Sequence, residues 1–246
     1  MTGTILNVIA IIVGSGLGML LGSRLPDRLK QTVISGLGLF TFALGISMFL
    51  ETQNALVVLG SLVIGALLGE WWRLEDRLLG LGTWLEARFN LRKQDDQPAS
   101  LRAQERFIRG FLTASLVFMV GPLSILGSIQ DGLPGDYPLL TVNSMLDGFP
   151  SLAFASSLGI GVAFSALPTL IYQGGISLLA AQVQSVTSDA MMTEMTATGG
   201  IILLSIAVSS LLELRKIRSA NFLPALLIAP LAVALLTALG INLATP

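Results

Sequence analysis

The sequence contains no cysteine and no histidine among its 246 residues. The first absence excludes disulfides, thiol nucleophiles and Cys/His zinc sites, and the second excludes acid–base catalysis by imidazole. Charge is also scarce, because Asp, Glu, Lys and Arg make up 12% of the residues and leave a net charge of −1. No basic stripe with interleaved aromatic residues is present, so nucleic acid is not an expected partner.

Hydrophobic residues dominate what remains. They make up 53% of the chain, and the mean hydropathy is +0.79. This composition is typical of membrane proteins, so we predict an all-α polytopic helix bundle whose main partner is the lipid bilayer. The N-terminal MTGTILNVIA has no basic residue and continues into an apolar stretch. We interpret it as the first span rather than a cleaved signal peptide.

Apolar stretches of the usual length, about twenty residues, predict about eight spans, with seven as the alternative count. They lie at 4–23, 31–50, 54–72, 107–127, 147–166, 168–185, 197–214 and 221–241. Lys and Arg cluster at 24–30, 73–109 and 215–218. Because positive charge near span ends marks the cytoplasmic side, we expect these loops in the cytoplasm and both termini outside.

One segment occurs twice. LPDRLKQTVISGL at 25–37 returns as LPTLIYQGGISLL at 167–179, each at the joint between two apolar runs. Self-similarity at a fixed offset indicates duplication. We therefore predict two parallel repeats of four helices each, at 1–127 and 147–246, joined by an outer linker or re-entrant segment at 128–146. Chance similarity between Leu-rich segments is the alternative.

Residues 73–109 form the longest loop, and they divide into a helical part and a hinge. Apolar residues recur at helical spacing, which predicts a helix lying in the membrane interface or extending the third span; they are Leu74, Leu78, Leu81, Leu85 and Phe89. KQDDQPAS at 93–100 is then a polar hinge that lets the fourth span turn back. A docking surface for a partner is the alternative for this loop.

Small residues form rows on several spans, and Gly14, Gly18 and Gly22 make a GxxxGxxxG row. Lipid tails are as apolar as leucine, so helices in a bilayer associate where small residues let backbones approach. We expect these rows to pack the bundle internally. A homo-oligomer formed through the glycine-rich faces is a further expectation.

Polar side chains inside spans are costly and therefore suggest function. The densest set includes Asp131, Asn143 and Asp147, and the sequence predicts a helix break at Asp147–Pro150 that aims polar groups at a common cavity. These side chains are candidates for binding a cation, relaying a proton or forming an oxygen-rich site. The alternative is that both aspartates cap helices or form turns in an external loop.

The repeated segment supplies further candidates, the pairs Gln31 and Ser35, and Gln173 and Ser177. They are expected either to contact solute from opposite sides of a pseudo-twofold axis or to hydrogen-bond neighbouring helices. Glu194 is expected at the start of the seventh span, near the positive end of the helix dipole, with a gate role as the alternative. No phosphate loop, nucleophile elbow or metal-ligand spacing appears. We therefore expect no catalytic residue, no bound metal, no cofactor and no enzymatic activity.

Several blocks resemble a known family. They are FMVGPLSILGSIQDGLPGDYPLL, SMLDGF, FASSLGIGVAFSALPTLIYQGGISLLA, TATGGIILL and KIRSANFLPALLIA. Together they resemble the bacterial YqgA/YdfK-like membrane proteins, also called the domain of unknown function 554 family, over almost the whole chain. The resemblance implies a multi-pass protein of the bacterial inner membrane with a common fold, and no activity. Asn143 stands where lysine is common in that family.

These observations together favour a transporter or channel for an ion or small solute, with a site at the interface of the two repeats. A non-transporting scaffold or assembly partner, using the glycine faces and the loop at 73–109, is the alternative.

Overall fold

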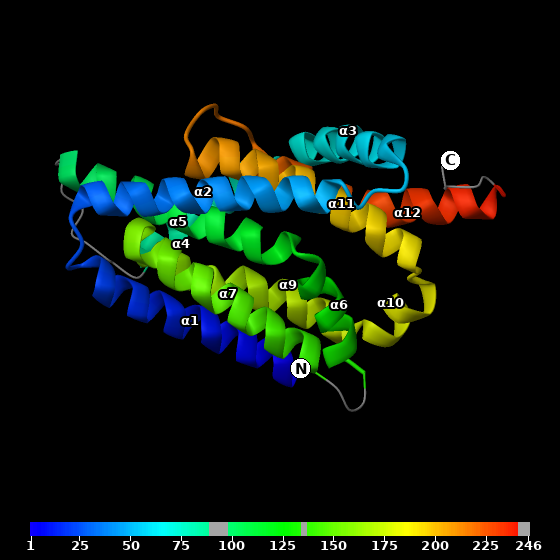
Figure 1. Cartoon of the computed structure of the whole chain (residues 1–246), viewed down its shortest axis with the longest axis horizontal. Coiled ribbons are helices and arrows are strands. Elements are labelled where there is room, and N and C mark those ends of the chain that lie inside the picture. The colour runs from blue at the N-terminus through cyan, green and yellow to red at the C-terminus, as the bar shows by residue number, and fades with distance from the viewer. Residues whose placement is uncertain (89–97, 134–136, 241–246) are drawn as a thin grey trace. The chain divides into compact units, whose positions relative to one another are not determined.

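The structure is a computed structural model that describes residues 1–88, 98–133 and 137–240, and this part of the chain is helical without strands (Figure 1). The helices are α1 (Thr2–Gly22), α2 (Asp27–Phe49), α3 (Ala55–Trp72), α4 (Leu74–Arg88), α5 (Pro98–Val120), α6 (Pro122–Asp131), α7 (Pro138–Leu158), α8 (Gly161–Phe164), α9 (Ala166–Leu178), α10 (Ala180–Val186), α11 (Asp189–Ile206) and α12 (Ala225–Ala238). A π-helical turn, η1 (Ala207–Leu211), continues α11, and a 3₁₀ turn, η2 (Ser219–Phe222), precedes α12.

In the described part of the chain, five helical segments are long and apolar enough to cross a membrane: α1, α2, α3, Asp189–Leu211 and Ser219–Ala238. A bent pair, Arg102–Val120 and Leu123–Asp131, brings the number to six if the two helices form one span; they meet at 67°. The all-α membrane class is therefore confirmed at this level.

The described helices form two compact units. Unit 1 contains Met1–Leu37, Asp76–Met119 and Leu123–Ala181, and unit 2 contains Gly38–Glu75, Val120–Pro122 and Gln182–Pro246. The predicted repeats at 1–127 and 147–246 divide the chain in a different way and stay a prediction.

In unit 1, α1 and α7 pack side by side and run parallel (Figure 1). A Cβ placed on Gly14, Gly18 or Gly22 would overlap a backbone carbonyl oxygen of α7, and the three oxygens are those of Gly148, Leu152 and Ser156. Both sets advance in the same direction along the chain, which establishes the parallel arrangement. The GxxxGxxxG row therefore packs the bundle internally, as predicted, because only glycine lets the two backbones approach this closely.

The predicted break at Asp147–Pro150 is wrong, because α7 is one helix from Pro138 to Leu158 with Pro150 inside it. A proline inside a helix removes one backbone donor and crowds the carbonyl one turn earlier, which can kink a helix without ending it, and α7 continues past Pro150. It ends at Gly159, whose φ of 82° lies in the left-handed region that glycine adopts without strain.

The helix predicted in the loop at 73–109 is confirmed as α4. Leu85 packs with Phe107 and Phe111 of α5 in a buried cluster, and Leu81 lies beside it. The predicted apolar row therefore faces the protein here. Phe89 and residues 93–97 lie outside the described part of the chain.

In unit 2, α3 packs against η2 and α12. Glu194 binds the segment just before α3 from a distant helix: its carboxylate accepts bonds from Thr52 Oγ1 at 2.6 Å, Gln53 N at 2.8 Å and Asn54 N at 2.9 Å. The first turn of α3 is itself capped by Asn54, whose Oδ1 accepts from Leu56 N at 3.1 Å, so the buried carboxylate holds the N-cap residue in place. Glu194 was expected in the first turn of its own helix, but it lies further inside α11.

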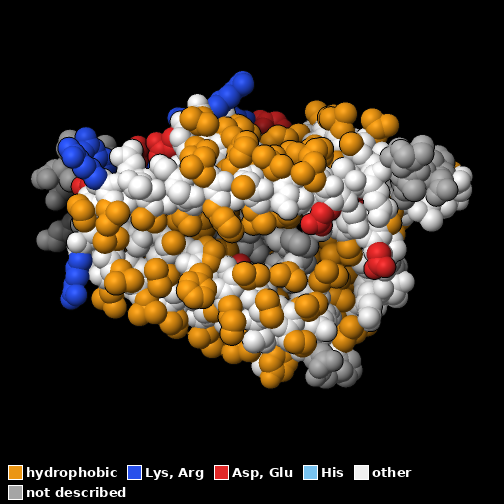
Figure 2. Space-filling model, in the orientation of Figure 1, with side chains coloured by type: hydrophobic (Ala, Val, Ile, Leu, Met, Phe, Trp, Pro, Cys, Tyr) orange, Lys and Arg blue, Asp and Glu red, His pale blue; other side chains and the backbone are white. Residues whose placement is uncertain are grey.

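Large hydrophobic side chains are exposed on the membrane-capable helices and spread over the face seen in Figure 2. On α1, Ile5 and Leu20 are 55% and 70% exposed, and on α2 Phe40 is 65% exposed. Apolar surface of this extent fits contact with lipid tails.

Candidate functional site

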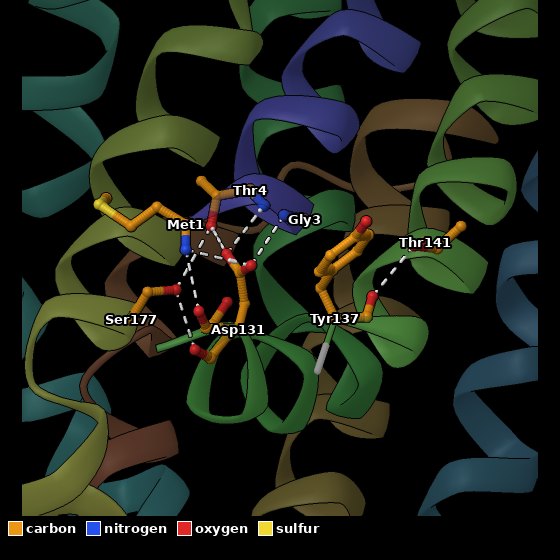
Figure 3. A network of polar contacts seen from close by, with 8 residues as sticks. Met1, Gly3, Thr4, Asp131, Tyr137, Thr141 and Ser177 are labelled. Carbon is orange, nitrogen blue, oxygen red and sulfur yellow. Dashed lines mark hydrogen bonds and ion pairs between the residues drawn. The ribbon is translucent and has the colours of Figure 1, made fainter. Parts of the chain in front are cut away.

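Asp131, the last residue of α6, binds the N-terminal turn of α1 (Figure 3). Its carboxylate accepts bonds from Gly3 N at 2.7 Å, Thr4 N at 3.0 Å and Thr4 Oγ1 at 2.9 Å. The amino group of Met1 lies 3.2 Å from Oδ1. Asp131 is 7% exposed. This negative charge is thus matched by the positive end of α1 and by its unpaired N–H groups.

Asp147 lies on α7 and is surrounded differently. Its Oδ2 accepts bonds from two side-chain amides, Asn7 Nδ2 and Asn143 Nδ2, each at 2.8 Å. Asn143 is one turn earlier on the same helix, whereas Asn7 reaches across from α1. Asp147 is 8% exposed, so the carboxylate is largely out of solvent.

Side chains of α1 and α9 lie between the two aspartates, Asn7 and Gln173 on the side of Asp147 and Thr4 and Ser177 on the side of Asp131. Asn7 Nδ2 also donates to Gln173 Oε1 at 3.1 Å, and Gln173 Nε2 donates to Ser124 Oγ at 2.8 Å. One turn along α9 from Gln173, Ser177 Oγ lies 3.3 Å from Thr4 Oγ1, which binds Asp131. We call this set the polar core; its members are Thr4, Asn7, Ser124, Asp131, Asn143, Asp147, Gln173 and Ser177.

The charge balance of the polar core is uneven. Within the described ranges, no Lys or Arg side chain pairs with Asp147, and the hydrogen bonds to its carboxylate come from the neutral amides of Asn7 and Asn143. A buried carboxylate without a counter-charge is costly. Asp147 is therefore the group of the polar core whose charge is least compensated.

Buried oxygen atoms without hydrogen-bond partners lie on the helices around Asp147. Asn7 Oδ1 belongs to the same amide whose Nδ2 contacts Asp147, and among the residues that the structure describes it has no hydrogen-bond partner. Thr169 Oγ1, one turn before Gln173 on α9, and Ser15 Oγ, on the same face of α1 as Asn7, are also unpaired. All three side chains are fully buried. Unpaired buried acceptors are rare and need an explanation.

The structure brings together five of the seven residues that the sequence singled out. Asp131, Asn143, Asp147, Gln173 and Ser177 are all in the polar core. Gln31 and Ser35 are not: both are exposed on α2, and the Ser35 hydroxyl donates to Gln31 O of its own helix at 3.0 Å. The two Gln/Ser pairs therefore differ in surroundings, one exposed and one buried, although their sequences match. The functional role of all seven stays a prediction.

Sequence reasoning missed Thr4 and Asn7, and it did not choose Ser124 as a site residue although Ser124 lies in the polar block around Asp131. The first two lie in a span that is otherwise almost wholly apolar, where isolated polar residues attract little attention. The signal was their spacing: Thr4, Asn7 and Ser15 fall on one helical face together with Gly14 and Gly18, all of them buried.

The chemistry available here is that of oxygen ligands and amides. No group of three or more Asp or Glu side chains that could hold a metal ion exists in the described part of the chain. The polar core therefore offers one uncompensated carboxylate and several neutral oxygens rather than a multi-carboxylate metal centre.

Comparison with known proteins decides the family. The family model described as "Protein of unknown function (DUF554)" matches residues 2–234. The chain belongs to the DUF554 family. Within it, the chain is 34% identical over 246 residues to "Uncharacterized membrane protein YdfK" of Bacillus subtilis (strain 168), covering 98% of this chain and 100% of that protein. It is 33% identical over 234 residues to "Uncharacterized protein YqgA" of Escherichia coli (strain K12), covering 94% of this chain and 96% of that protein.

Membership of the DUF554 family confirms the resemblance seen in the sequence. The name of the Bacillus relative calls it a membrane protein, in agreement with the apolar helices of this chain. No solved structure matches the chain. The DUF554 relatives thus supply a membrane class and no activity, so the function must be argued from the polar core.

Proposed function

We propose that this chain is a transporter or channel for an ion or small solute, with its site in the polar core of unit 1. The observation that carries the proposal is Asp147: a carboxylate 8% exposed, on a helix packed along a membrane-capable span, bonded only by neutral amides. Ionisable groups within membrane segments are expensive and mark ion or substrate pathways by default.

The depth of the site supports this proposal. Asn7, which contacts Asp147, lies five residues after the start of α1, or roughly 8 Å along the helix axis. Asp147 is therefore inside the length of a span and not at its mouth. A carboxylate needed only for a surface turn would gain nothing from this placement.

An eight-span topology is part of the proposal. α7 extends along α1 from Leu140, beside Gly3, to Ser156, beside Gly22, so it is as long as a helix that can itself cross the membrane. α9 then returns, since Gln173 contacts Asn7 and Ser177 contacts Thr4. Polar residues such as Asn143 and Asp147 lower the mean hydropathy of α7, which explains why α7 is not among the helices whose composition marks them as membrane spans.

Two parallel repeats are also supported by packing. α1 and α7 overlap the first spans of the two predicted repeats, and they run parallel in unit 1. α3 and α11 overlap the third spans, and in unit 2 the start of α3 meets the second turn of α11. The first and third spans would thus each lie beside their counterpart. The site would then lie where α1 of the first repeat meets α7 of the second, at the repeat interface in unit 1.

We place the protein in the bacterial inner membrane, with the basic loops in the cytoplasm and both termini outside. We propose no enzymatic activity for it. The alternative function, a scaffold or homo-oligomer, has one specific observation in its favour: Gly36 on α2 and Gly60 on α3 have no atom within 4 Å of an added Cβ, so these positions are open to a partner helix.

The test is flux through reconstituted vesicles. Purified protein in liposomes is assayed for tracer uptake and osmotic swelling with chloride salts, sugars and amino acids. We expect at least one solute to pass faster than through protein-free vesicles. Asp147→Asn should abolish this flux, while Asp76→Asn, the same change at an exposed aspartate of α4, should leave it intact. A panel without flux would overturn the proposal, and flux unchanged in Asp147→Asn would remove the site from the polar core.

A further inference from the structure

We propose that the ligand of the polar core is a single alkali-metal cation, Na⁺ or K⁺, bound without its full hydration shell between α1, α7 and α9. The Asp147 carboxylate supplies the charge, and the unpaired oxygens of Asn7 and Thr169 supply neutral ligands. The role of this cation as cargo or coupling ion rests on the proposed transport function. The binding itself does not.

Charge decides between monovalent and divalent ions. One carboxylate lies at the site, and within the described residues no second acid or base contacts it. A monovalent cation would neutralise it, whereas a divalent ion would leave one positive charge buried without compensation, which is costly in a medium of low dielectric. Mg²⁺ and Ca²⁺ sites usually contain more carboxylates, or waters and phosphates.

The ligand chemistry decides between a metal cation and a proton. A proton on Asp147 would remove the negative charge, and its O–H could pair with one acceptor such as Asn7 Oδ1, but a single proton cannot also satisfy Thr169 Oγ1. A metal cation would both neutralise the carboxylate and bind the unpaired oxygens, because amide and hydroxyl oxygens are hard ligands suited to hard cations. Asn7 is placed for this, since its amide already contacts Asp147 at 2.8 Å.

These unpaired oxygens lie on α1 and α9, and the direction of these two helices sets their order. α9 runs antiparallel to α1, because Ser177 lies beside Thr4 and Gln173 beside Asn7. Thr169, one turn earlier on α9, is then one turn deeper along α1, and Ser15 is deeper still on the same face. Thr169 Oγ1 is thus the next unpaired oxygen inward from Asn7 along the α1–α9 contact, whereas Ser15, eight residues after Asn7 and roughly 12 Å along the axis of α1, lies beyond the reach of the same ion.

The experiment is thermal unfolding of the purified full chain in detergent, where no gradient exists. LiCl, NaCl, KCl, MgCl₂ and CaCl₂ are compared with choline chloride at equal ionic strength and at two pH values. A ligand that binds the folded state raises its stability with the logarithm of concentration above Kd. We expect Tm to rise in this way with NaCl or KCl, the rise to disappear in Asp147→Asn and Asn7→Ala, and the rise to persist in Asp76→Asn.

Other outcomes overturn the assignment. A Tm that responds only to pH would identify a proton, and one that responds only to MgCl₂ or CaCl₂ would identify a divalent site. No response to any salt in a folded wild-type protein would remove the cation altogether. The unfolding and vesicle assays test different proposals. Flux of another solute without a Tm response to cations would support transport and contradict the cation site. A Tm response without flux would support cation binding and contradict transport.

Discussion

At the scale of single residues, replacing Asn143 by lysine would put a covalently attached ammonium group in place of the bound metal cation. Its Nδ2 lies 2.8 Å from Asp147 Oδ2, one helical turn away. In Asn143→Lys the ammonium can reach the same carboxylate, since side chains at i and i+4 share a face. We expect this variant to lose the Tm response to NaCl and KCl and to be more stable than wild type in choline chloride. Thermal unfolding of both proteins in the two salts measures this.

A size control accompanies that variant, because Asn143 is buried and lysine is longer. Asn143→Met fills a similar volume without a charge. It should keep the cation response and gain no stability in choline chloride. If Asn143→Met lost the response as fully as Asn143→Lys, steric disruption and not charge would be the cause.

Asp131 should behave in the opposite way to Asp147, because its charge is already matched by the N-terminus of α1. In Asp131→Asn only one acceptor oxygen remains, and the new NH₂ faces the N–H groups of Gly3 and Thr4. Leaving a buried donor unpaired costs about 1–3 kcal/mol. We expect a lower Tm in every salt with an unchanged NaCl or KCl response. A lost response would show that Asp131 also binds the ion.

The sequence allowed part of this site to be predicted. Asn143 and Asp147, like Gln173 and Ser177, recur at i and i+4 in apolar surroundings, and that spacing alone places each pair on one helical face. The partner helix could not be predicted in the same way. Asn7 meets Asp147 only because α1 and α7 pack parallel, a tertiary contact that no local pattern encodes. Gln31 matches Gln173 in sequence, yet Gln31 is exposed whereas Gln173 is buried. The two copies of the motif share a local sequence, so their difference in burial comes from the helices that pack against each copy.

At the scale of helices, the α1–α7 contact depends on the absence of side chains at three positions. In Gly18→Ala the new methyl group would overlap Leu152 O, a backbone atom that cannot move aside without displacing α7. Overpacking of this kind costs about 1–3 kcal/mol. We expect Gly18→Ala to lower Tm and to weaken cation binding, because Asn7 and Asp147 lie on the two helices being forced apart.

Gly16→Ala is the matched control for this contact. It lies in the same helix two residues away, and an added Cβ there meets nothing within 4 Å. Alanine favours helix over glycine by about 0.8–1.0 kcal/mol in water, so Tm should stay equal or rise slightly. Equal losses at both positions would mean that the close approach of Leu152 O is not the cause of the Gly18 result, because helix propensity favours alanine at both positions.

Helix ends were harder to predict than helix faces. Glu194 was assigned from local sequence to the start of its own helix, yet its carboxylate binds Gln53 N and Asn54 N at the start of α3. Asp131 does the same for α1. In both cases the acid lies far along the chain from the helix start that it contacts, so no capping motif of three or four residues could reveal the contact. Pro150 shows the converse, a strong local breaker that the surrounding helix tolerates.

At the scale of the whole molecule, topology decides whether the polar core lies across a membrane. The chain has no cysteine, so single cysteines can report accessibility without background labelling. Lys30→Cys and Lys216→Cys should react with an impermeant maleimide only after the inner membrane is opened. Asp189→Cys should react in intact spheroplasts. These positions test the sidedness that the basic loops predict.

Those three positions do not separate eight spans from six, because omitting the two crossings made by α7 and α9 leaves the others on the same sides. Leu167, 40% exposed at the start of α9, separates them. If α7 and α9 both cross, Leu167→Cys lies on the cytoplasmic side with Lys30; if the segment stays at the outer surface, it lies with Asp189. We expect the cytoplasmic result, since Ser157 Oγ of α7 lies 3.3 Å from Lys30 O in the first basic cluster. Labelling of Leu167→Cys in intact spheroplasts would remove α7 and α9 from the membrane span, and with them the proposed path through Asp147.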